Sequence, residues 1–359
     1  MLDSRATSLE LAELTLELCK IPSPTGRERE VADFVAGRCQ GAVGREAVQR
    51  LGNSVVCDPA AVSGSFTSPV VGLFGHLDTV ECAAGQPLEI RGERVYGCGA
   101  SDMKGGVAVM LSLLHRWREL RGRPVFVFYD KEEGPNQENG LEAVLESGLL
   151  PEFEFGFILE PTDGNLHLGC LGLLHATVTV PGRRAHSARP WQGENALYRA
   201  IPLLERLRDR VAREVEVGGL TFQEVVTATQ AWTENSRNVI PGEVRFNLNA
   251  RFAPGRTCAD AERELRALVA GAGEVEVVDR AEAGEVHGDH PLILAWRRSE
   301  GLVAEPKQAW TDVARLTGRG IPAVNFGPGA TAQAHQRGEW CPVRGLERCH
   351  AALLRFFKG

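Results

Sequence analysis

The feature of the sequence that most limits the fold is a series of short apolar runs, each followed at once by polar residues. Three such runs span residues 69–74, 125–129 and 156–159. Runs of this length and apolar character are typical of strands that are buried on both faces. Helical segments are expected between them, at about 103–120 and 140–147. Alternating strands and helices predict an α/β fold with a mostly parallel sheet and helices on both faces.

A different pattern occupies the middle of the chain. Residues 244–252 alternate strictly, with the even-numbered positions apolar, as in a strand with one buried face. Together with their neighbours they predict a β-α-β-β-α-β, ferredoxin-like order at about 174–180, 195–211, 221–228, 244–252, 258–269 and 275–278. The α/β pattern returns after residue 286. We therefore expect two domains, one of residues 1–175 and 287–359, and an inserted α+β domain of residues 176–286.

Composition narrows the class of protein. The 359 residues carry a formal net charge of −7, which argues against a nucleic-acid partner. The first 20 residues mix charged and apolar side chains and do not resemble a signal peptide. No apolar run approaches the roughly 18 residues that a membrane helix needs. These features predict a soluble, cytoplasmic protein that does not bind a membrane.

The nine cysteines are scattered from Cys19 to Cys349, and none forms a C-x-x-C pair. This distribution predicts reduced thiols, mostly buried as small apolar side chains. Neither disulfide bonds nor a structural zinc site built from cysteine is expected.

The residues that follow the predicted strands form a set that suits a metal site. Because the carboxyl ends of parallel strands meet at one edge of the sheet, these polar residues are expected to lie close together. Histidine and carboxylate ligands without cysteine fit catalytic zinc, cobalt or manganese. Two histidines and three carboxylates hold two ions if one carboxylate bridges them. The candidates are His76, Asp78, Asp102, Glu132, Glu133, Glu160 and His335.

Each candidate also has a structural interpretation when it is taken alone. His76 fits a hydrogen-bonded turn at a strand end, Asp102 fits a helix N-cap, and Glu132 with Glu133 fits a solvated acidic loop. Glu160 ends a strongly apolar run just before Pro161, where an unpaired carboxylate is costly, so a ligand role is favoured. No G-x-S-x-G or H-E-x-x-H motif is present, so neither a serine hydrolase nor a zincin is supported.

Taken together and in order, the motifs resemble those of the di-zinc amidohydrolase family. That family includes succinyl-diaminopimelate desuccinylase, acetylornithine deacetylase and glutamate carboxypeptidase. The motifs are GHLDTV, YGCGASDMKGG, the EE pair, LEPTDG and the late GPG…AHQ..E. Four further segments are most similar to the actinobacterial type of succinyl-diaminopimelate desuccinylase: FYDKEEGPNQENGL, GRRAHSAR, NVIPGEV and KQAWTDVARLTGRGIPAVNFGPG.

The resemblance implies a role for each candidate. Asp102 would bridge two divalent ions, zinc with cobalt or manganese as alternatives. His76 and Glu160 would complete one site, and Glu133 and His335 the other. Glu132 would act as general base, and Asp78 would support His76.

The resemblance also implies that the inserted domain serves as lid and dimerisation domain, so that the protein would be a homodimer. His186 would enter the partner subunit's site and stabilise the oxyanion, while Asn238 and Arg251 would bind substrate. Arg315 would hold a second carboxylate, although the spacing from Asp312 to Arg315 is one residue longer than in the TSDGR form of proteobacterial enzymes. Without the resemblance, His186 fits a loop histidine and Arg251 a surface arginine facing away from its domain's core.

The implied reaction is hydrolysis of an N-acyl amide of a small amino acid that carries carboxylates. N-Succinyl-L,L-2,6-diaminopimelate, which would give L,L-diaminopimelate and succinate for lysine and cell-wall precursor synthesis, is the favoured substrate. Acetylornithine deacetylase, carrier-protein lysine hydrolase and dipeptidase activities are alternatives. A non-catalytic metal-binding protein on the same fold is a third hypothesis, which the complete set of ligands and Glu132 argues against.

Overall fold

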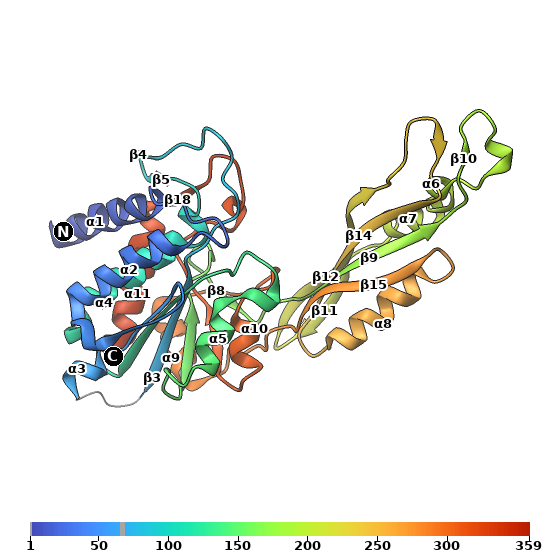
Figure 1. Ribbon diagram of the computed structural model, residues 1–359. Coiled ribbons are helices and arrows are strands. Elements are labelled where there is room, and N and C mark those ends of the chain that lie inside the picture. Colours follow the sequence, from blue (N-terminus) through green and yellow to red (C-terminus); the bar gives the residue numbers. More distant parts are fainter. Residues whose placement is uncertain (1, 65–68) are drawn as a thin grey trace. The chain divides into compact units, whose positions relative to one another are not determined.

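The computed structural model describes residues 2–64 and 69–359, which form two compact units (Figure 1). Unit 1 comprises the chain as far as Gly169 together with His287–Glu305 and Arg315–Gly359. Unit 2 comprises Cys170–Val286 and Pro306–Ala314. Relative to the boundaries expected from sequence, residues 170–175 and 306–314 lie with unit 2. Among the described residues, none of the helices has the length and apolar character of a membrane span.

Unit 1 is built on an eight-stranded sheet whose four central strands, β6, β3, β7 and β17, are parallel. Strands β1 and β2 add an antiparallel edge, and β8 pairs antiparallel with β17. This arrangement confirms the predicted α/β class with a mostly parallel sheet. In sheet order the strands are β1 (Val48–Leu51), β2 (Ser54–Cys57), β6 (Arg123–Tyr129), β3 (Val70–His76), β7 (Phe155–Ile158), β17 (Ala323–Asn325), β8 (Leu166–Leu168) and β16 (Ala304–Pro306).

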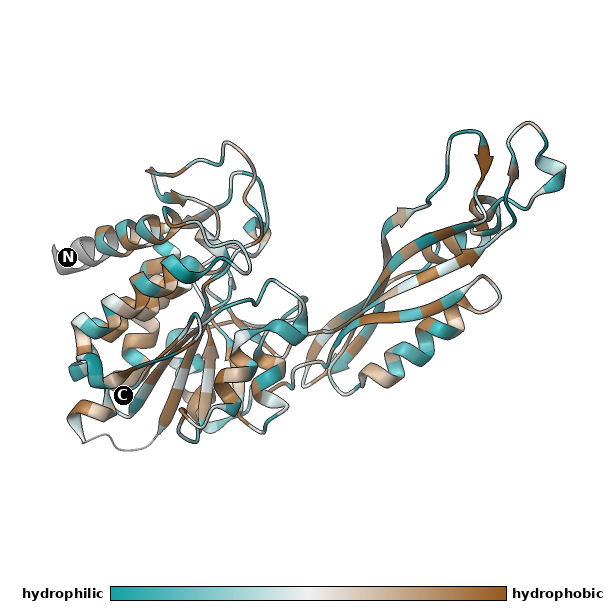
Figure 2. Ribbon diagram, viewed as in Figure 1, coloured by the Kyte–Doolittle hydropathy of each residue, from teal (hydrophilic) through white to brown (hydrophobic). Residues whose placement is uncertain are grey.

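Helices cover both faces of this sheet. On one face, Phe157 of β7 packs edge-on against Trp296 of α9 and Phe356 of α11. On the other, α5 and α10 lie over the strands, and Leu316 of α10 approaches Gly156. Figure 2 shows the strands as the most apolar part of unit 1. The helices are α1 (Leu2–Cys19), α2 (Arg29–Val43), α3 (Ala60–Ser63), α4 (Gly105–His115), α5 (Gly140–Glu146), α9 (Pro291–Glu300), α10 (Val313–Thr317) and α11 (Val343–Lys358).

A small antiparallel sheet extends unit 1 beside α1. It has the order β18-β5-β4, with β4 at Glu89–Arg91, β5 at Arg94–Tyr96 and β18 at Trp340–Pro342. The pairing of β18 with β5 brings β18 and the residue before it, Glu339, next to residues 97–104, which connect β5 to α4. Short helical turns complete the chain: η1 (Arg45–Ala47), η2 (Ala100–Lys104), η3 (Trp117–Glu119), η4 (Asn136–Glu138), η5 (Pro190–Gln192) and η6 (Thr331–Gln333).

Unit 2 has the predicted ferredoxin-like order. Its antiparallel sheet runs β11-β12-β14-β9-β15, with helices on one face only. In β14 the even-numbered residues are buried and the odd-numbered ones are partly exposed, as the alternating pattern predicted. The elements are β9 (Gly172–Pro181), β10 (Ala185–His186), α6 (Ala196–Arg199), α7 (Ile201–Arg208), β11 (Arg213–Val217), β12 (Leu220–Trp232), β13 (Val239–Ile240), β14 (Glu243–Phe252), α8 (Cys258–Val269) and β15 (Glu274–Ala281).

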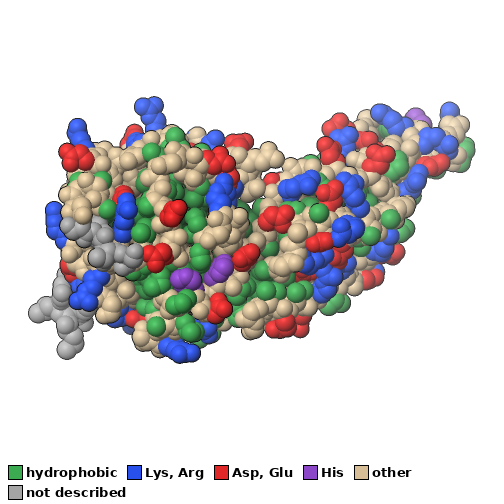
Figure 3. Space-filling model, turned by 90° about the horizontal axis from the view of Figure 1, so that it is seen from below, with side chains coloured by type: hydrophobic (Ala, Val, Ile, Leu, Met, Phe, Trp, Pro, Cys, Tyr) green, Lys and Arg blue, Asp and Glu red, His purple; other side chains and the backbone are tan. Residues whose placement is uncertain are grey.

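A network of arginines and glutamates ties α8 to the sheet of unit 2, where charges of both signs are interspersed (Figure 3). Glu264 accepts hydrogen bonds from Arg256 at 2.7 Å and from Arg213 at 3.1 Å, and it also pairs with Arg210. Burial opposes the charge on Glu264, but the bonds from Arg256 and Arg210 outweigh it and lower the pKa from 4.5 to about 2.

This pKa predicts how stability depends on pH. The folded carboxyl group stays ionised where the unfolded one binds a proton, so the stabilisation is complete above about pH 4.5 and is lost as pH falls towards 2. Glu264→Gln should lower the free energy of unfolding at pH 7 by about 1 kcal/mol and remove this part of the acid sensitivity. Urea denaturation followed by circular dichroism at pH 3 and pH 7 measures both effects. Equal pH dependence in the two proteins would contradict the assignment.

Candidate metal centre

The candidate ligands lie in the loops at the carboxyl edge of the four parallel strands. His76 is the last residue of β3, and Glu132 and Glu133 follow the end of β6. Glu160 comes two residues after β7, and His335 lies in the loop that leaves β17. Asp102 reaches the same edge from the η2 turn, just before α4. All belong to unit 1.

The side chains of His76, Asp102 and Glu133 converge, with one ligand atom of each lying within 4.8 Å of the others. The Nε2 atom of His76 is 3.3 Å from Oδ1 of Asp102 and 3.5 Å from Oε1 of Glu160. The Nε2 atom of His335 is 2.9 Å from Oε1 of Glu133 and 3.5 Å from Oδ2 of Asp102. All five ligands predicted from the sequence are therefore in one cluster.

Asp102 occupies the middle of this cluster. Its Oδ1 atom faces His76, which is also close to Glu160, and its Oδ2 atom faces His335, which is also close to Glu133. The helix α4 begins only at Gly105, so the alternative interpretation of Asp102 as a helix N-cap is wrong. Two imidazoles and three carboxylates arranged in this way fit a divalent cation, since such donors suit hard or borderline metals.

The carboxylates around the two histidines of the cluster raise the pKa of both imidazoles. Burial alone would lower the pKa of His76, but hydrogen bonds to Asp102 and Asp78 outweigh it and raise that pKa well above its usual value. The hydrogen bond to Glu133 raises the pKa of His335 to about 9, although partial burial opposes it. A cation bound between these groups would take the place of the protons that the imidazoles hold.

Asp78 is completely buried and organises two parts of the site at once. Its Oδ1 and Oδ2 atoms accept hydrogen bonds from the backbone N–H groups of Glu132 and Glu133, both at 2.9 Å. Thr25 donates a third bond to Oδ2 at 2.9 Å. The Nδ1 atom of His76 lies 3.0 Å from the backbone oxygen of Asp78 and 3.5 Å from its Oδ1. Asp78 thus fixes the start of the Glu132 loop as well as the imidazole of His76.

The loop that carries His335 packs tightly onto the other ligand loops. A side chain at Gly327 would collide with the backbone oxygens of Leu159 and Glu160, and one at Gly329 would collide with that of Ser101. Asp163 accepts a hydrogen bond from the backbone N–H of Thr331 at 3.3 Å and another from its hydroxyl. Glycine is required at these two positions because backbone touches backbone there.

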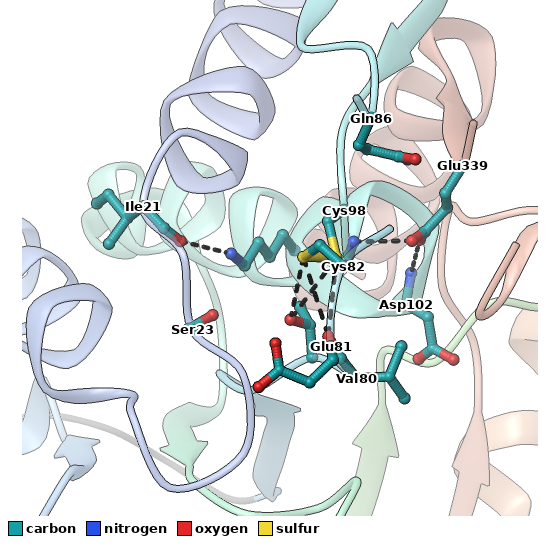
Figure 4. The surroundings of a disulfide bond; sticks show 12 residues. Ile21, Ser23, Val80, Glu81, Cys82, Gln86, Cys98, Asp102 and Glu339 are labelled. Atoms are coloured by element: carbon teal, nitrogen blue, oxygen red, sulfur yellow. Dashed lines mark hydrogen bonds between the residues drawn. A yellow bond between two sulfur atoms is a disulfide. The ribbon is translucent and has the colours of Figure 1, made fainter. Parts of the chain in front are cut away.

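The structure corrects the prediction that the protein has no disulfide bond. Cys82 and Cys98 are bonded to each other, with Sγ atoms 2.13 Å apart, while the other seven cysteines are free and buried (Figure 4). The bond links the segment after Asp78 to the segment before Asp102. The 16-residue separation and the lack of a C-x-x-C motif concealed the pair in the sequence.

Sequence reasoning also missed Glu339, which is only 3% exposed. Its carboxylate accepts hydrogen bonds from the backbone N–H groups of Gly99 and Ser101, both at 2.8 Å, and of Asp102 at 3.0 Å (Figure 4). Burial raises the pKa of Glu339 to about 7 despite these bonds. The only signal in the sequence was its place in the AHQ..E motif.

The predicted substrate ligands of unit 2 lie in two places. His186 and Asn238 are neighbours, because β10 pairs with β13 and the N–H of Ser187 donates to the backbone oxygen of Asn238 at 2.9 Å. Arg251 lies on β14 and faces away from the core of unit 2. Within the part of the chain that the structure describes, no carboxylate forms an ion pair with Arg251.

Arg315 does not have the surroundings expected of a substrate ligand. Its guanidinium donates to Glu142 at 2.7 Å and to the backbone oxygen of Asn136 at 2.6 Å. Its side chain is 9% exposed. Arg315 therefore holds the loop between β6 and α5, which contains Glu132 and Glu133. Its contact with a substrate carboxylate stays a prediction.

Comparison with known proteins identifies the family. Residues 72–359 match the model of peptidase family M20/M25/M40. The chain belongs to this family. It is 36% identical to a putative succinyl-diaminopimelate desuccinylase of Mycobacterium tuberculosis, over 100% of both chains. It is 35% identical to succinyl-diaminopimelate desuccinylase of Corynebacterium glutamicum, covering 96% of this chain and 95% of that one.

A solved structure agrees in fold. A dinuclear metal binding peptidase of Bacillus subtilis from the M20 family superposes with a TM-score of 0.66, at 18% identity and 98% coverage of both chains. The predicted class of enzyme, a metal-dependent amidohydrolase, is confirmed by the family and by these relatives.

Metal binding should stabilise the folded protein. At a free zinc concentration of 100 times the dissociation constant, the free energy of unfolding should rise by about 2.7 kcal/mol, which corresponds to several degrees in melting temperature. Thermal melts of chelator-treated protein with and without zinc measure this shift. Asp102→Ala should abolish it, whereas His175→Ala, a change in unit 2, should retain it. A full shift in Asp102→Ala would show that zinc binds elsewhere.

Proposed function

We propose that the protein hydrolyses N-succinyl-L,L-2,6-diaminopimelate to L,L-diaminopimelate and succinate. The observation that carries the proposal is the combination of an unbroken ligand cluster with two relatives of that name that align over nearly their entire lengths. The names of the relatives narrow the choice of substrate, and the ligand cluster supports metal-dependent hydrolysis.

We further propose that the centre holds two divalent ions, zinc in the first instance, with cobalt or manganese as substitutes. His76 and Glu160 would hold one ion, Glu133 and His335 the other, and Asp102 both. The separate directions of the two Asp102 oxygens support this division. When bound, the ions would acidify a water molecule and polarise the acyl carbonyl.

A residue of the chain, Glu132, would then transfer the proton. Glu132 is the base in this scheme, since it adjoins the ligand Glu133 and its backbone is fixed by Asp78. Its carboxylate removes a proton from water while the water oxygen bonds to the acyl carbon. When the amide C–N bond breaks, the same proton passes to the leaving nitrogen. The second proton of the water then leaves the new carboxyl group for the amine, so the products are a carboxylate and an ammonium group, and atoms and charges balance.

Unit 2 would supply recognition. His186 would donate a hydrogen bond to the oxyanion of the tetrahedral state, from the partner subunit, and Asn238 would bind substrate beside it. Arg251 offers a guanidinium that no carboxylate of the described chain neutralises, which suits a substrate carboxylate. A succinyl group needs a cation of this kind at its acyl end, whereas an acetyl group does not.

An assay of amine release tests this function. Zinc-loaded protein should release amine from N-succinyl-L,L-diaminopimelate, and a chelator should stop the reaction. Glu132→Gln should bind metal normally and lose activity by at least about 100-fold, the usual contribution of a positioned acid–base group. Full activity of this variant would overturn the role of Glu132.

The alternative substrates are outcomes of the same assay. N-Acetylornithine and dipeptides should be turned over much more slowly than the succinyl compound. If amine is released preferentially from N-acetylornithine, the proposed metal-dependent hydrolysis would stand and the proposed substrate would be wrong. Preferential cleavage of a dipeptide would assign the protein to the peptidases of the family.

We also propose that the protein is a homodimer formed through unit 2. Apolar side chains are exposed on and after α6 and α7, among them Tyr198 at 71%, Ile201 at 46% and Val211 at 84%. Beside them, residues 225–232 of β12 pair with β14 on one side, while β11 pairs only with residues 220–224, so within unit 2 this edge of the strand is open. Such an edge readily accepts a strand from a second copy.

Charge placed at this surface should separate the subunits. Ile201→Glu should sediment as a monomer at concentrations where the unmodified protein sediments as a dimer, because burying a carboxylate in an apolar interface is costly. Leu88→Glu, at an exposed apolar position of unit 1, is the matched control and should remain dimeric. A dimer of unchanged stability in Ile201→Glu would place the interface elsewhere.

A further inference from the structure

Glu339 is a buried carboxylate in an unusual setting. It is 3% exposed, yet within the described chain no lysine, arginine or histidine forms an ion pair with it. Three backbone N–H groups, from Gly99, Ser101 and Asp102, are its hydrogen-bond donors. Lys104 and His335 act on Glu339 electrostatically but form no salt bridge with it. Burying a carboxylate that is not paired with a cation costs free energy, and an apolar side chain at this position would avoid that cost. A contribution to folding stability therefore explains this residue less well than a role in positioning the backbone to which it bonds.

What Glu339 holds is the backbone that leads into the central ligand. Residues 99–102 begin the η2 turn, in which Asp102 has non-helical backbone angles and Gly99 has a φ of +76°. The Oε1 atom accepts from both Ser101 and Asp102, and Oε2 accepts from Gly99. The two oxygens thus grip both ends of this four-residue segment. They fix the orientation of the peptide from which the Asp102 side chain projects.

Glu339 also joins the two halves of the centre. It lies four residues after His335, and its own backbone oxygen accepts from the N–H of Gly97 at 3.1 Å. The next residue, Trp340, accepts from the hydroxyl of Ser101 at 2.8 Å. The segment that follows His335 and the segment that leads to Asp102 are therefore held together by the side chain of Glu339 and by the backbone oxygens of Glu339 and Trp340 (Figure 4).

We propose that Glu339 is a positioning residue of the metal centre, whose carboxylate sets the direction in which the two oxygens of Asp102 face. The proposal rests on the two-metal centre described above, and it assigns Glu339 no contact with substrate. Groups that orient metal ligands from behind typically change metal affinity 10- to 100-fold when they are removed.

The test is a metal titration of Glu339→Gln. Glutamine keeps the shape but offers one acceptor oxygen, so at least one N–H of residues 99–102 loses its partner. Cobalt binding, followed by the visible absorption of the ion and by equilibrium dialysis, should weaken 10- to 100-fold. Glu339→Asp, which keeps the charge but withdraws the oxygens by one methylene, should lose affinity too.

Glu224→Gln is the matched control. Glu224 is a buried carboxylate of unit 2, 5% exposed, that accepts from the N–H of Ala253 at 2.8 Å and from Arg256 at 2.7 Å. Its substitution should lower the melting temperature of the metal-free protein and leave cobalt affinity unchanged. If Glu339 has a purely structural role, Glu339→Gln and Glu339→Asp should also lower the melting temperature and leave cobalt affinity unchanged. That result would overturn the proposal.

The titration uses no substrate, so it separates this proposal from the proposed activity. If the unmodified protein binds cobalt but releases no amine from the succinyl compound, the substrate is wrong and the role of Glu339 can still be measured. If Glu339→Gln and Glu339→Asp both bind cobalt as tightly as the unmodified protein, the role of Glu339 is wrong whatever the substrate.

Discussion

The constraint on which this structure depends is the mutual repulsion of carboxylates gathered at one edge of a sheet. Glu132, Glu133, Glu160 and Asp102 all reach the same place, and no fold collects like charges without holding them there. The parallel sheet provides the position, because its four central strands end together. Backbone N–H groups provide the restraint: Asp78 secures the Glu132 loop and Glu339 secures the segment before Asp102.

Much of this could be predicted from the sequence because the strands that carry the ligands are buried on both faces. A buried strand must be almost entirely apolar, so His76 and Glu160 mark the points where two of those strands end. Parallel pairing then brings the ends together without further information. The same reasoning identified the open face of β14, since alternation alone places Arg251 opposite the buried even-numbered residues.

The residues that sequence reasoning missed make contacts that leave no periodic pattern in the sequence. Glu339 accepts from N–H groups about 240 positions earlier, and neither end of that contact has a periodic signature. The Cys82–Cys98 bond was missed for a similar reason, since the proximity of the two thiols depends on how two loops pack. Arg315 was matched to a family motif, and the structure adds contacts that the motif does not indicate, since its guanidinium donates to Glu142 and Asn136.

The proposed division of roles, with the reaction in unit 1 and recognition in unit 2, would explain why the motifs reveal the reaction more readily than the substrate. Water activation at this centre needs its whole set of donors, so a change to one ligand would disturb the reaction itself. Recognition of an acyl group needs only a cation or a hydrogen-bond donor at the right distance, and a single change on the open face of a sheet supplies or removes one. Arg251, on such a face, can therefore change without disturbing the core of unit 2. Asp102 cannot, because its two oxygens face both histidines of the centre.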